Sequence, residues 1–257
     1  MITREFAVGT PDHDIQLDID VKAAAVTLDR GPAGRVTVQV DTKHPDDWLV
    51  TQNGDSIIVR DEPSGWRRRN GSARVRVTVP DGAGAAITTA SGDVTVLVAT
   101  GRTSISTASG DVRVGVAASL AVKTASGDIT VDRVAGDVSL KSASGDLSAA
   151  AVGGELESST ASGDVRVETV TGDARISTAS GDVRIARFEG AAFVVNTVSG
   201  DISVGIPSGR SVDLDVKTLS GDVILPDRRS GGSTAAPTGR VAIRVKSVSG
   251  DFRLQRA

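Results

Sequence analysis

The sequence predicts an all-β fold: a single-stranded β-solenoid, of the β-helix or β-roll kind, built from two-strand coils of about 18 residues. The first observation is that the tripeptide Ser-Gly-Asp occurs nine times, and its first seven copies recur every 17 to 19 residues. The second is that apolar and polar residues alternate after the copies, as in Val112-Arg113-Val114, which is the period of a β-strand. Repeats that each bury one face on their neighbours are typical of stacked coils.

A weaker echo of the motif indicates the second strand of each coil. It lies about nine residues after most copies, as at Gly136-Asp137 and Gly172-Asp173, and alternating runs such as Val138–Ser142 follow it. A column of hydroxyl residues in these strands has the parity of the aliphatic residues, so we expect it to point inward and its hydroxyls to stack on each other. The column contains Thr107, Thr124, Ser142, Thr160, Thr178, Thr197, Thr218 and Ser247.

The motif is absent from residues 1–80, which still alternate in segments such as Arg35–Val40. A terminal repeat is atypical because it must cover the open end of a stack. We therefore predict an N-terminal β cap over residues 1–80 that is continuous with the solenoid, and solenoid repeats over residues 81–257. The Pro- and Gly-containing segment 226–239 lengthens the last interval between motifs and is predicted to be a loop insertion.

Composition excludes several classes of function. The chain is 39% hydrophobic with a formal net charge of -3, which predicts a folded, soluble protein without bulk attraction for nucleic acid. Cysteine is absent, so disulfides and thiolate metal sites are excluded. The N-terminal residues form no apolar signal core, and no run is long and apolar enough to cross a bilayer. We therefore expect a cytoplasmic location.

The order of these features resembles a known bacterial family. Short alternating strands, a Val79-Pro80 step and repeated Thr-Ala-Ser-Gly-Asp-Val blocks are similar to the β-strand-repeat family called "putative adhesin" or toast-rack domain, a domain of unknown function. The likeness spans nearly the whole chain, and its most specific element is the repeated Ser-Gly-Asp-Val register. The resemblance implies a β-solenoid without established catalytic activity and, for some members, a link to envelope stress or surface attachment.

The motif glycines and aspartates are predicted to form a structural turn ladder along one edge of the stack. Neighbouring carboxylates about 4.8 Å apart would repel by about 1 kcal/mol in water. We therefore expect each carboxylate to accept hydrogen bonds from turn amides or from a serine. The predicted ladder contains Gly92, Asp93, Gly110, Asp111, Gly127, Asp128, Gly145, Asp146, Gly163, Asp164, Gly181, Asp182, Gly200, Asp201, Gly221, Asp222, Gly250 and Asp251.

A calcium-binding β-roll is a second interpretation of the aspartates, because Gly-Gly-x-Gly-x-Asp repeats bind calcium between successive turns. Each turn of this chain has one Gly-Asp pair and lacks the further glycines and carbonyls that would complete a shell of six to eight oxygens. We favour the structural ladder and predict no metal, no cofactor and no small-molecule substrate. Calorimetry with calcium tests the alternative.

Catalytic residues are not predicted. His13 and His44 are the only histidines, and neither lies in a metal-binding or catalytic pattern. Tight turns between short strands also leave little room to wall a substrate pocket. The predicted function is a non-enzymatic structural or interaction scaffold of adhesin type, which self-assembles or is linked to envelope stress.

Two features predict a protein partner or self-association. The C-terminal coil, Ser249–Ala257, shows no capping helix, so its uncovered ladder would pair with another copy, and proline at Arg253 would remove the oligomers. The loop 63–71 contains Trp66, Arg67, Arg68 and Arg69, a candidate contact that is also compatible with a solvated turn. The alternative function is therefore a binding module for a protein or membrane partner through this loop, with contact to a membrane surface left open.

Overall fold

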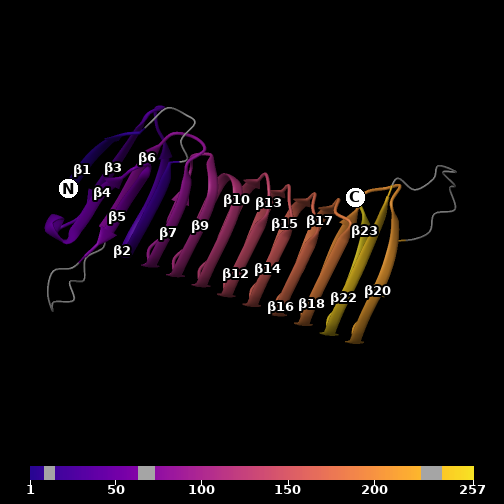
Figure 1. The fold of residues 1–257 in the computed structure, drawn as a ribbon. Helices are drawn as coiled ribbons and strands as arrows, with labels where there is room; N and C mark the ends of the chain where they lie inside the picture. The colour runs from indigo at the N-terminus through magenta and orange to yellow at the C-terminus, as the bar shows by residue number, and fades with distance from the viewer. Residues whose placement is uncertain (9–14, 63–72, 227–238) are drawn as a thin grey trace. The chain divides into compact units, whose positions relative to one another are not determined.

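The all-β fold class predicted from the sequence is confirmed. A computed structural model describes residues 1–8, 15–62, 73–226 and 239–257, which are mostly β-strand (Figure 1). Within these ranges the single helical segment is a 3-10 turn, Pro45–Asp47, and no helix is long and apolar enough to cross a bilayer. The chain forms two compact units, Met1–Arg133 and Val134–Ala257.

The first unit begins with antiparallel strands. Strand β3 pairs with β1 on one side and with β6 on the other, and β4 pairs with β5 as a hairpin. The bounds are Ile2–Ala7 for β1, Arg35–Asp41 for β3, Trp48–Asn53 for β4, Ser56–Asp61 for β5 and Ala73–Val79 for β6.

Strand β2 connects these strands to the repeated coils of the same unit. Its first half pairs in parallel with β5 and β7, and its second half pairs in parallel with β6 and β8. Strand β9 pairs in parallel with β7. Strand β10 pairs in parallel with β8 through its first residues and with β9 through its later residues. The bounds are Gln16–Arg30 for β2, Gly84–Ser91 for β7, Val94–Val96 for β8, Thr100–Ser109 for β9, Val112–Ser126 for β10 and Ile129–Val134 for β11.

The second unit contains two parallel ladders, whose strands alternate along the chain. We call the strands before each Ser-Gly-Asp corner the first ladder and the strands after it the second ladder. Partners are one repeat apart, as Val165 and Val183 are. The first ladder includes β12 (Val138–Ser144), β14 (Leu156–Ser162), β16 (Ala174–Ser180) and β18 (Ala192–Ser199); the second includes β13 (Leu147–Val152), β15 (Val165–Val170), β17 (Val183–Phe188) and β19 (Ile202–Ile206).

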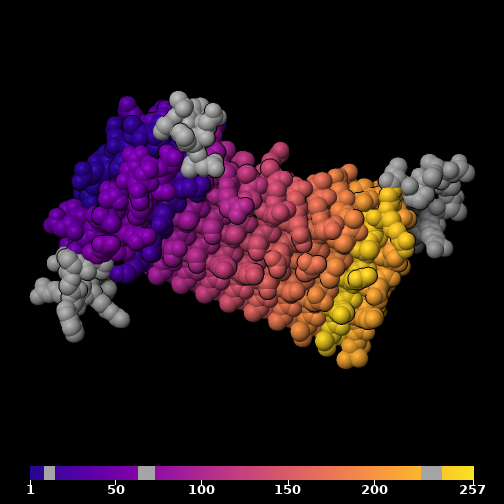
Figure 2. Space-filling model, in the orientation of Figure 1, coloured from indigo at the N-terminus to yellow at the C-terminus, as the bar shows by residue number. Residues whose placement is uncertain are grey.

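The last two coils are exchanged in space relative to their order in the chain. Strand β22 (Arg240–Ser249) lies between β18 and β20 (Ser211–Ser220), and β23 (Phe252–Arg256) lies between β19 and β21 (Val223–Ile224). Figure 2 shows the yellow C-terminal coil with orange residues on both sides.

The prediction that the C-terminal coil forms the uncovered end is therefore wrong. Phe252 and Leu254 of this coil are buried, whereas the coil of β20 and β21 is half-buried or exposed. The C-terminal coil has Phe252 where the other coil has Val223, so it buries more apolar surface at the inner place. Proline at Arg253 would remove a bond inside the ladder and would not act at its edge.

Buried side chains at alternate positions form the core of each unit. One file of the second unit contains, in spatial order, Leu140, Ser158, Ile176, Val195, Val245 and Val216. Ser158 is its only polar member, and its buried hydroxyl has no hydrogen-bond partner among the described residues. Phe188 and Phe193 lie in the same unit with their ring centroids 5.4 Å apart.

Candidate functional site

The Ser-Gly-Asp corners require glycine for two reasons. All nine motif glycines have a positive φ, between 119° and 140°, a region that side chains disfavour. A Cβ on Gly163 would also lie 2.1 Å from the carbonyl oxygen of Gly145, and one on Gly181 would lie 2.2 Å from that of Gly163. Successive corners therefore stack backbone against backbone.

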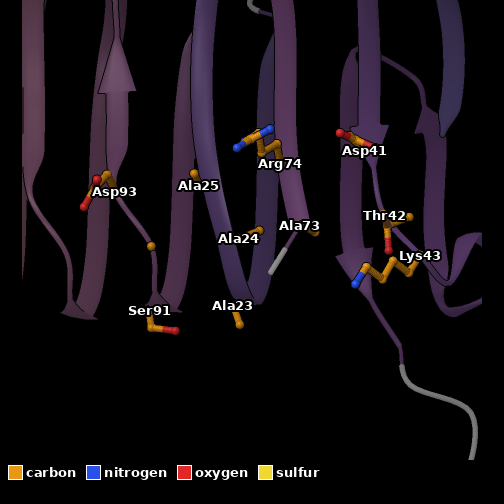
Figure 3. Close-up of a pocket in the computed structure, with 11 residues that line it drawn as sticks. Ala23, Ala24, Ala25, Asp41, Thr42, Lys43, Ala73, Arg74, Ser91 and Asp93 are labelled. Carbon is orange, nitrogen blue, oxygen red and sulfur yellow. The ribbon is translucent and has the colours of Figure 1, made fainter. Parts of the chain in front are cut away.

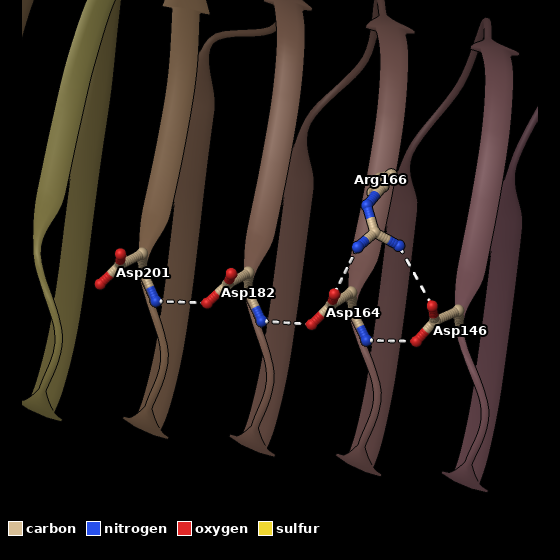
Figure 4. A network of polar contacts seen from close by, with 5 residues as sticks. All are labelled: Asp146, Asp164, Arg166, Asp182 and Asp201. Atoms are coloured by element: carbon tan, nitrogen blue, oxygen red, sulfur yellow. Dashed lines mark hydrogen bonds and ion pairs between the residues drawn. The ribbon is translucent and has the colours of Figure 1, made fainter.

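The aspartate carboxylates connect successive coils. The main-chain N–H of Asp182 donates to Oδ1 of Asp164 at 2.8 Å, and the N–H of Asp164 donates to Oδ1 of Asp146 at 2.9 Å (Figure 4). In the first unit, Asp111 and Asp128 donate in the same way to Asp93 and Asp111, at 3.0 and 3.1 Å. Each of these bonds satisfies a turn amide of the next coil, so turn amides, one of the two kinds of donor expected from the sequence, are the donors here.

The aspartates at the exchanged coils follow the spatial order of the coils. Asp251 donates from its N–H to Oδ1 of Asp201, and Asp222 donates to Oδ1 of Asp251, each at 2.9 Å. The predicted turn residues are thus brought together in one file per unit. Asp222, although it precedes Asp251 in the chain, is the last member of the file in the second unit.

Arg166 bridges two carboxylates of this file. Its guanidinium contacts Oδ2 of Asp146 at 3.1 Å and also bonds to Asp164. The N–H of Asp164, and then Arg166, hold the pKa of Asp146 below its ordinary value. Ionised Asp146 therefore contributes stability above the carboxyl pKa of the unfolded chain, and this contribution is lost as the pH falls through the lowered pKa.

The inward hydroxyls also bond to the main chain at the corners. Thr160 Oγ1 donates to the carbonyl oxygen of Ser162 at 3.0 Å, and Thr178 Oγ1 donates to that of Ser180 at 3.2 Å. The threonines do stand in register, as Thr160 and Thr178 do. They stack inward as expected, and each hydroxyl donates to the main-chain carbonyl two residues further along the chain.

Removing the carboxylate of Asp164 should lower the free energy of unfolding more than replacing it with a neutral amide. Asp164→Ala deletes the acceptor of the Asp182 N–H and a partner of Arg166, so we expect the free energy of unfolding to fall by about 1 kcal/mol. Asp164→Asn keeps a side-chain oxygen at Oδ1 and should stay within about 0.5 kcal/mol of the parent protein. Urea unfolding measures both variants, and equal losses would show that the charge, not the hydrogen bond, matters.

A cavity of about 490 Å³ lies in the first unit beside the corner of Asp93 (Figure 3). Its charged lining residues are Asp41, Lys43, Arg74 and Asp93, and Asp41 is the register partner of Arg74. Much of the remaining lining is alanine, including Ala23–Ala25, which occupy the corner position of the β2 coil. Sequence reasoning missed this cavity; the alanine run was its one available signal.

Several predicted contact residues lie outside the described residues. They are Trp66, Arg67, Arg68 and Arg69; His13, for which no contact is predicted, also lies outside the described residues. The loop therefore stays a prediction. In the part of the chain that is described, no three His, Asp or Glu side chains gather closely enough to hold a metal ion.

The chain is similar to a known protein family and to several solved structures. A family model described as Toastrack DUF4097 matches residues 15–255. A "putative adhesin" from Bacteroides fragilis NCTC 9343 is 15% identical, with a TM-score of 0.46 over 98% of this chain and 96% of that one. A "putative lipid binding protein" from Parabacteroides distasonis ATCC 8503 is 15% identical, with a TM-score of 0.42 over 100% and 94% of the two chains. No curated protein matches.

Proposed function

Since the chain belongs to the Toastrack DUF4097 family, we propose that it is a non-enzymatic scaffold of adhesin type that presents a regular surface to a protein partner. The observation that carries this proposal is the use of the repeated polar groups. Aspartate carboxylates bond to amides of the next coil and threonine hydroxyls bond to corner carbonyls. The repeated groups thus build a frame, and the outward strand positions are left for recognition.

The outward positions of the first ladder offer both signs of charge in register. One file runs, in spatial order, through Ser139, Glu157, Arg175, Val194, Arg244 and Asp215. A mixed file of this kind complements the mixed charges of a protein surface better than the uniform charge of a nucleic acid. We therefore propose a protein as the partner.

Three finer points of the proposal rest on the sequence and the family resemblance alone. They are the role of residues 1–80 as the cap of a β-solenoid, a cytoplasmic location and a link to envelope stress. The calcium-binding β-roll remains an alternative that calorimetry tests.

Photo-cross-linking in the native cell tests the scaffold. A cross-linking residue at Arg175, on the outer side of the first ladder, should give one discrete adduct, whereas the same residue at Arg184, on the second ladder, should not. Reversing the local charges with Glu157→Arg and Arg175→Glu should remove the adduct of a cross-linker placed at Ser177, without changing urea unfolding. Absence of any discrete adduct from both ladders would contradict a partner-binding surface.

The second candidate function is a binding module that uses the loop with Trp66 and the three arginines. It is favoured by the position of Ala73 and Arg74, which follow the loop in the chain and line the cavity of the first unit. Replacing Arg67, Arg68 and Arg69 with alanine should then abolish capture of a partner by a folded protein. Unchanged capture by that variant would leave the ladder surface as the recognition site.

A further inference from the structure

In the described part of the chain, the coil of β20 and β21 ends the second unit, and one edge of its strands has no pairing partner. Among the described residues, β20 pairs only with β22 and β21 only with β23. The N–H of Ser211 donates to the carbonyl oxygen of Gly239 at 2.9 Å, toward β22. Because successive residues of a strand point their main-chain groups in alternate directions, the even-numbered residues from Val212 to Thr218 direct theirs to the free edge.

The same coil exposes side chains that are core residues elsewhere in the stack. Val223 is 44% exposed, whereas Phe252, its register partner in the next coil, is 2% exposed. Val212, Leu214 and Val216 are half-buried in β20, although their partners in β22 are fully buried. Leu225 is 50% exposed and extends the apolar end face. A contiguous apolar face with a free strand edge is typical of an interaction surface.

The chain's own connection is a poor cover for this end. Residues 226–239 contain no branched aliphatic and no aromatic side chain, and they include two prolines. They can bury little apolar surface, and proline donates no ladder hydrogen bond. The cover must come from a more apolar strand, and β20 is itself such a strand.

We propose that two copies of this chain join end to end through antiparallel pairing of β20, with Val216 opposite Val216 of the second copy. In this register Asp215 lies opposite Lys217 of the second copy, and the two-fold axis repeats the pair. Leu214 lies opposite Thr218 of the second copy on the inward side. The central pair is apolar, Val216 with Val216, and the outward pairs on either side of it join opposite charges.

Charge selects this register over its neighbours. Sliding one strand by two residues in one direction places Asp215 opposite itself, beside two Asp213–Lys217 pairs, and sliding it by two residues in the other direction places Lys217 opposite itself. Like charges directly opposite each other destabilise a strand pair, whereas opposite charges stabilise it. Odd shifts would turn the inward residues outward, so they are excluded by the apolar face.

The N–H and C=O groups at the free edge of β20 can form hydrogen bonds in the same register. The facing pairs Val216–Val216 and Leu214–Thr218 are formed by residues whose N–H and C=O groups point to the edge, so these pairs can exchange both hydrogen bonds. Asp215 and Lys217 then form a non-hydrogen-bonded pair, in which opposite Cα atoms approach to about 4.5 Å and side chains are closest. The ion pairs therefore fall where cross-strand contact is strongest.

This inference deepens the proposed scaffold function and rests on it, because an end-to-end dimer would present two outer surfaces joined at their ends. Sedimentation of the full chain tests it. The parent protein should show a concentration-dependent dimer, and either Asp215→Lys or Lys217→Asp alone should raise the dissociation constant by about tenfold. An equimolar mixture of the two variants should regain the parent affinity, since lysine pairs of one then face aspartate pairs of the other.

Lys141→Asp, an equally exposed change on β12, is the matched control and should dimerise like the parent. At protein concentrations below the dissociation constant of the parent dimer, urea unfolding of all three variants should stay within about 0.5 kcal/mol of the parent, because each changed side chain is exposed. A monomeric parent protein, single variants that dimerise normally, or a mixture that fails to recover would each overturn the proposal. A monomer whose Val216 amide resists hydrogen exchange would show that the chain covers its own end. Cross-linking from Arg175 that persists in a monomer would refute the dimer and leave the scaffold function standing.

Discussion

Replacing Gly163 with alanine should lower the free energy of unfolding by about 4 kcal/mol, the sum of backbone strain and a steric conflict. Gly163 has a φ of 128°, and its Cβ would lie 2.1 Å from the Gly145 carbonyl oxygen. That oxygen belongs to the backbone of the next corner, so it cannot move without disturbing the ladder. Urea unfolding followed by circular dichroism measures the loss.

Gly82→Ala separates the two causes of this loss. Gly82 also has a positive φ, 89°, but no atom lies within 4 Å of its Cβ position. This variant should lose only about 1–2 kcal/mol, the cost of the left-handed backbone. Equal losses at Gly163 and Gly82 would contradict the close stacking of corners. Lys141→Ala, at an exposed strand position, should change stability by less than about 0.5 kcal/mol.

Phe193→Ala should cost about 3–5 kcal/mol, because it opens a cavity in a thin core. Phe193 is fully buried, and it stands in register between Ala174 and Ile243. The small side chain of Ala174 leaves space for the ring, and Phe188, from the preceding coil, lies with its ring centroid 5.4 Å from that of Phe193. The surrounding strands are held by ladders on both sides and cannot close the space.

Phe193→Leu and Val194→Ala are the controls for this prediction. Leucine keeps most of the apolar volume and should recover more than half of the loss. Val194 is the adjacent, outward residue, and its truncation should cost less than about 1 kcal/mol. A loss at Val194 as large as that at Phe193 would contradict the assigned inward and outward faces.

Much of the candidate site could be predicted from repetition. Equal spacing places Asp146, Asp164 and Asp182 in one column, and a glycine before each aspartate indicates a backbone turn that other residues disfavour. The acceptor role of the carboxylates could also be anticipated. Their actual donors could not, because an amide of the next coil and an amide of the same turn are equivalent in the sequence.

The cavity beside Asp93 shows where sequence reasoning stops. Asp41, Lys43 and Arg74 come from a stretch without repeats, and antiparallel pairing of β3 with β6 brings them to the corner. Antiparallel partners in this stretch have no common spacing. Their assembly depends on which apolar faces bury each other, and alternation alone does not encode that choice.

By itself, the sequence determined that the chain is all-β, which side of each strand is buried and which residues meet in the corners before the last two coils, because a period of two and a repeat near 18 residues constrain local geometry. Only the tertiary structure decided the order of the last coils and therefore which end is open. After Ile224 the chain can add the next coil on either side. The inner place goes to the coil with Phe252 because this side chain is larger than Val223, which has the same register position in the other coil, and burying it stabilises the stack more.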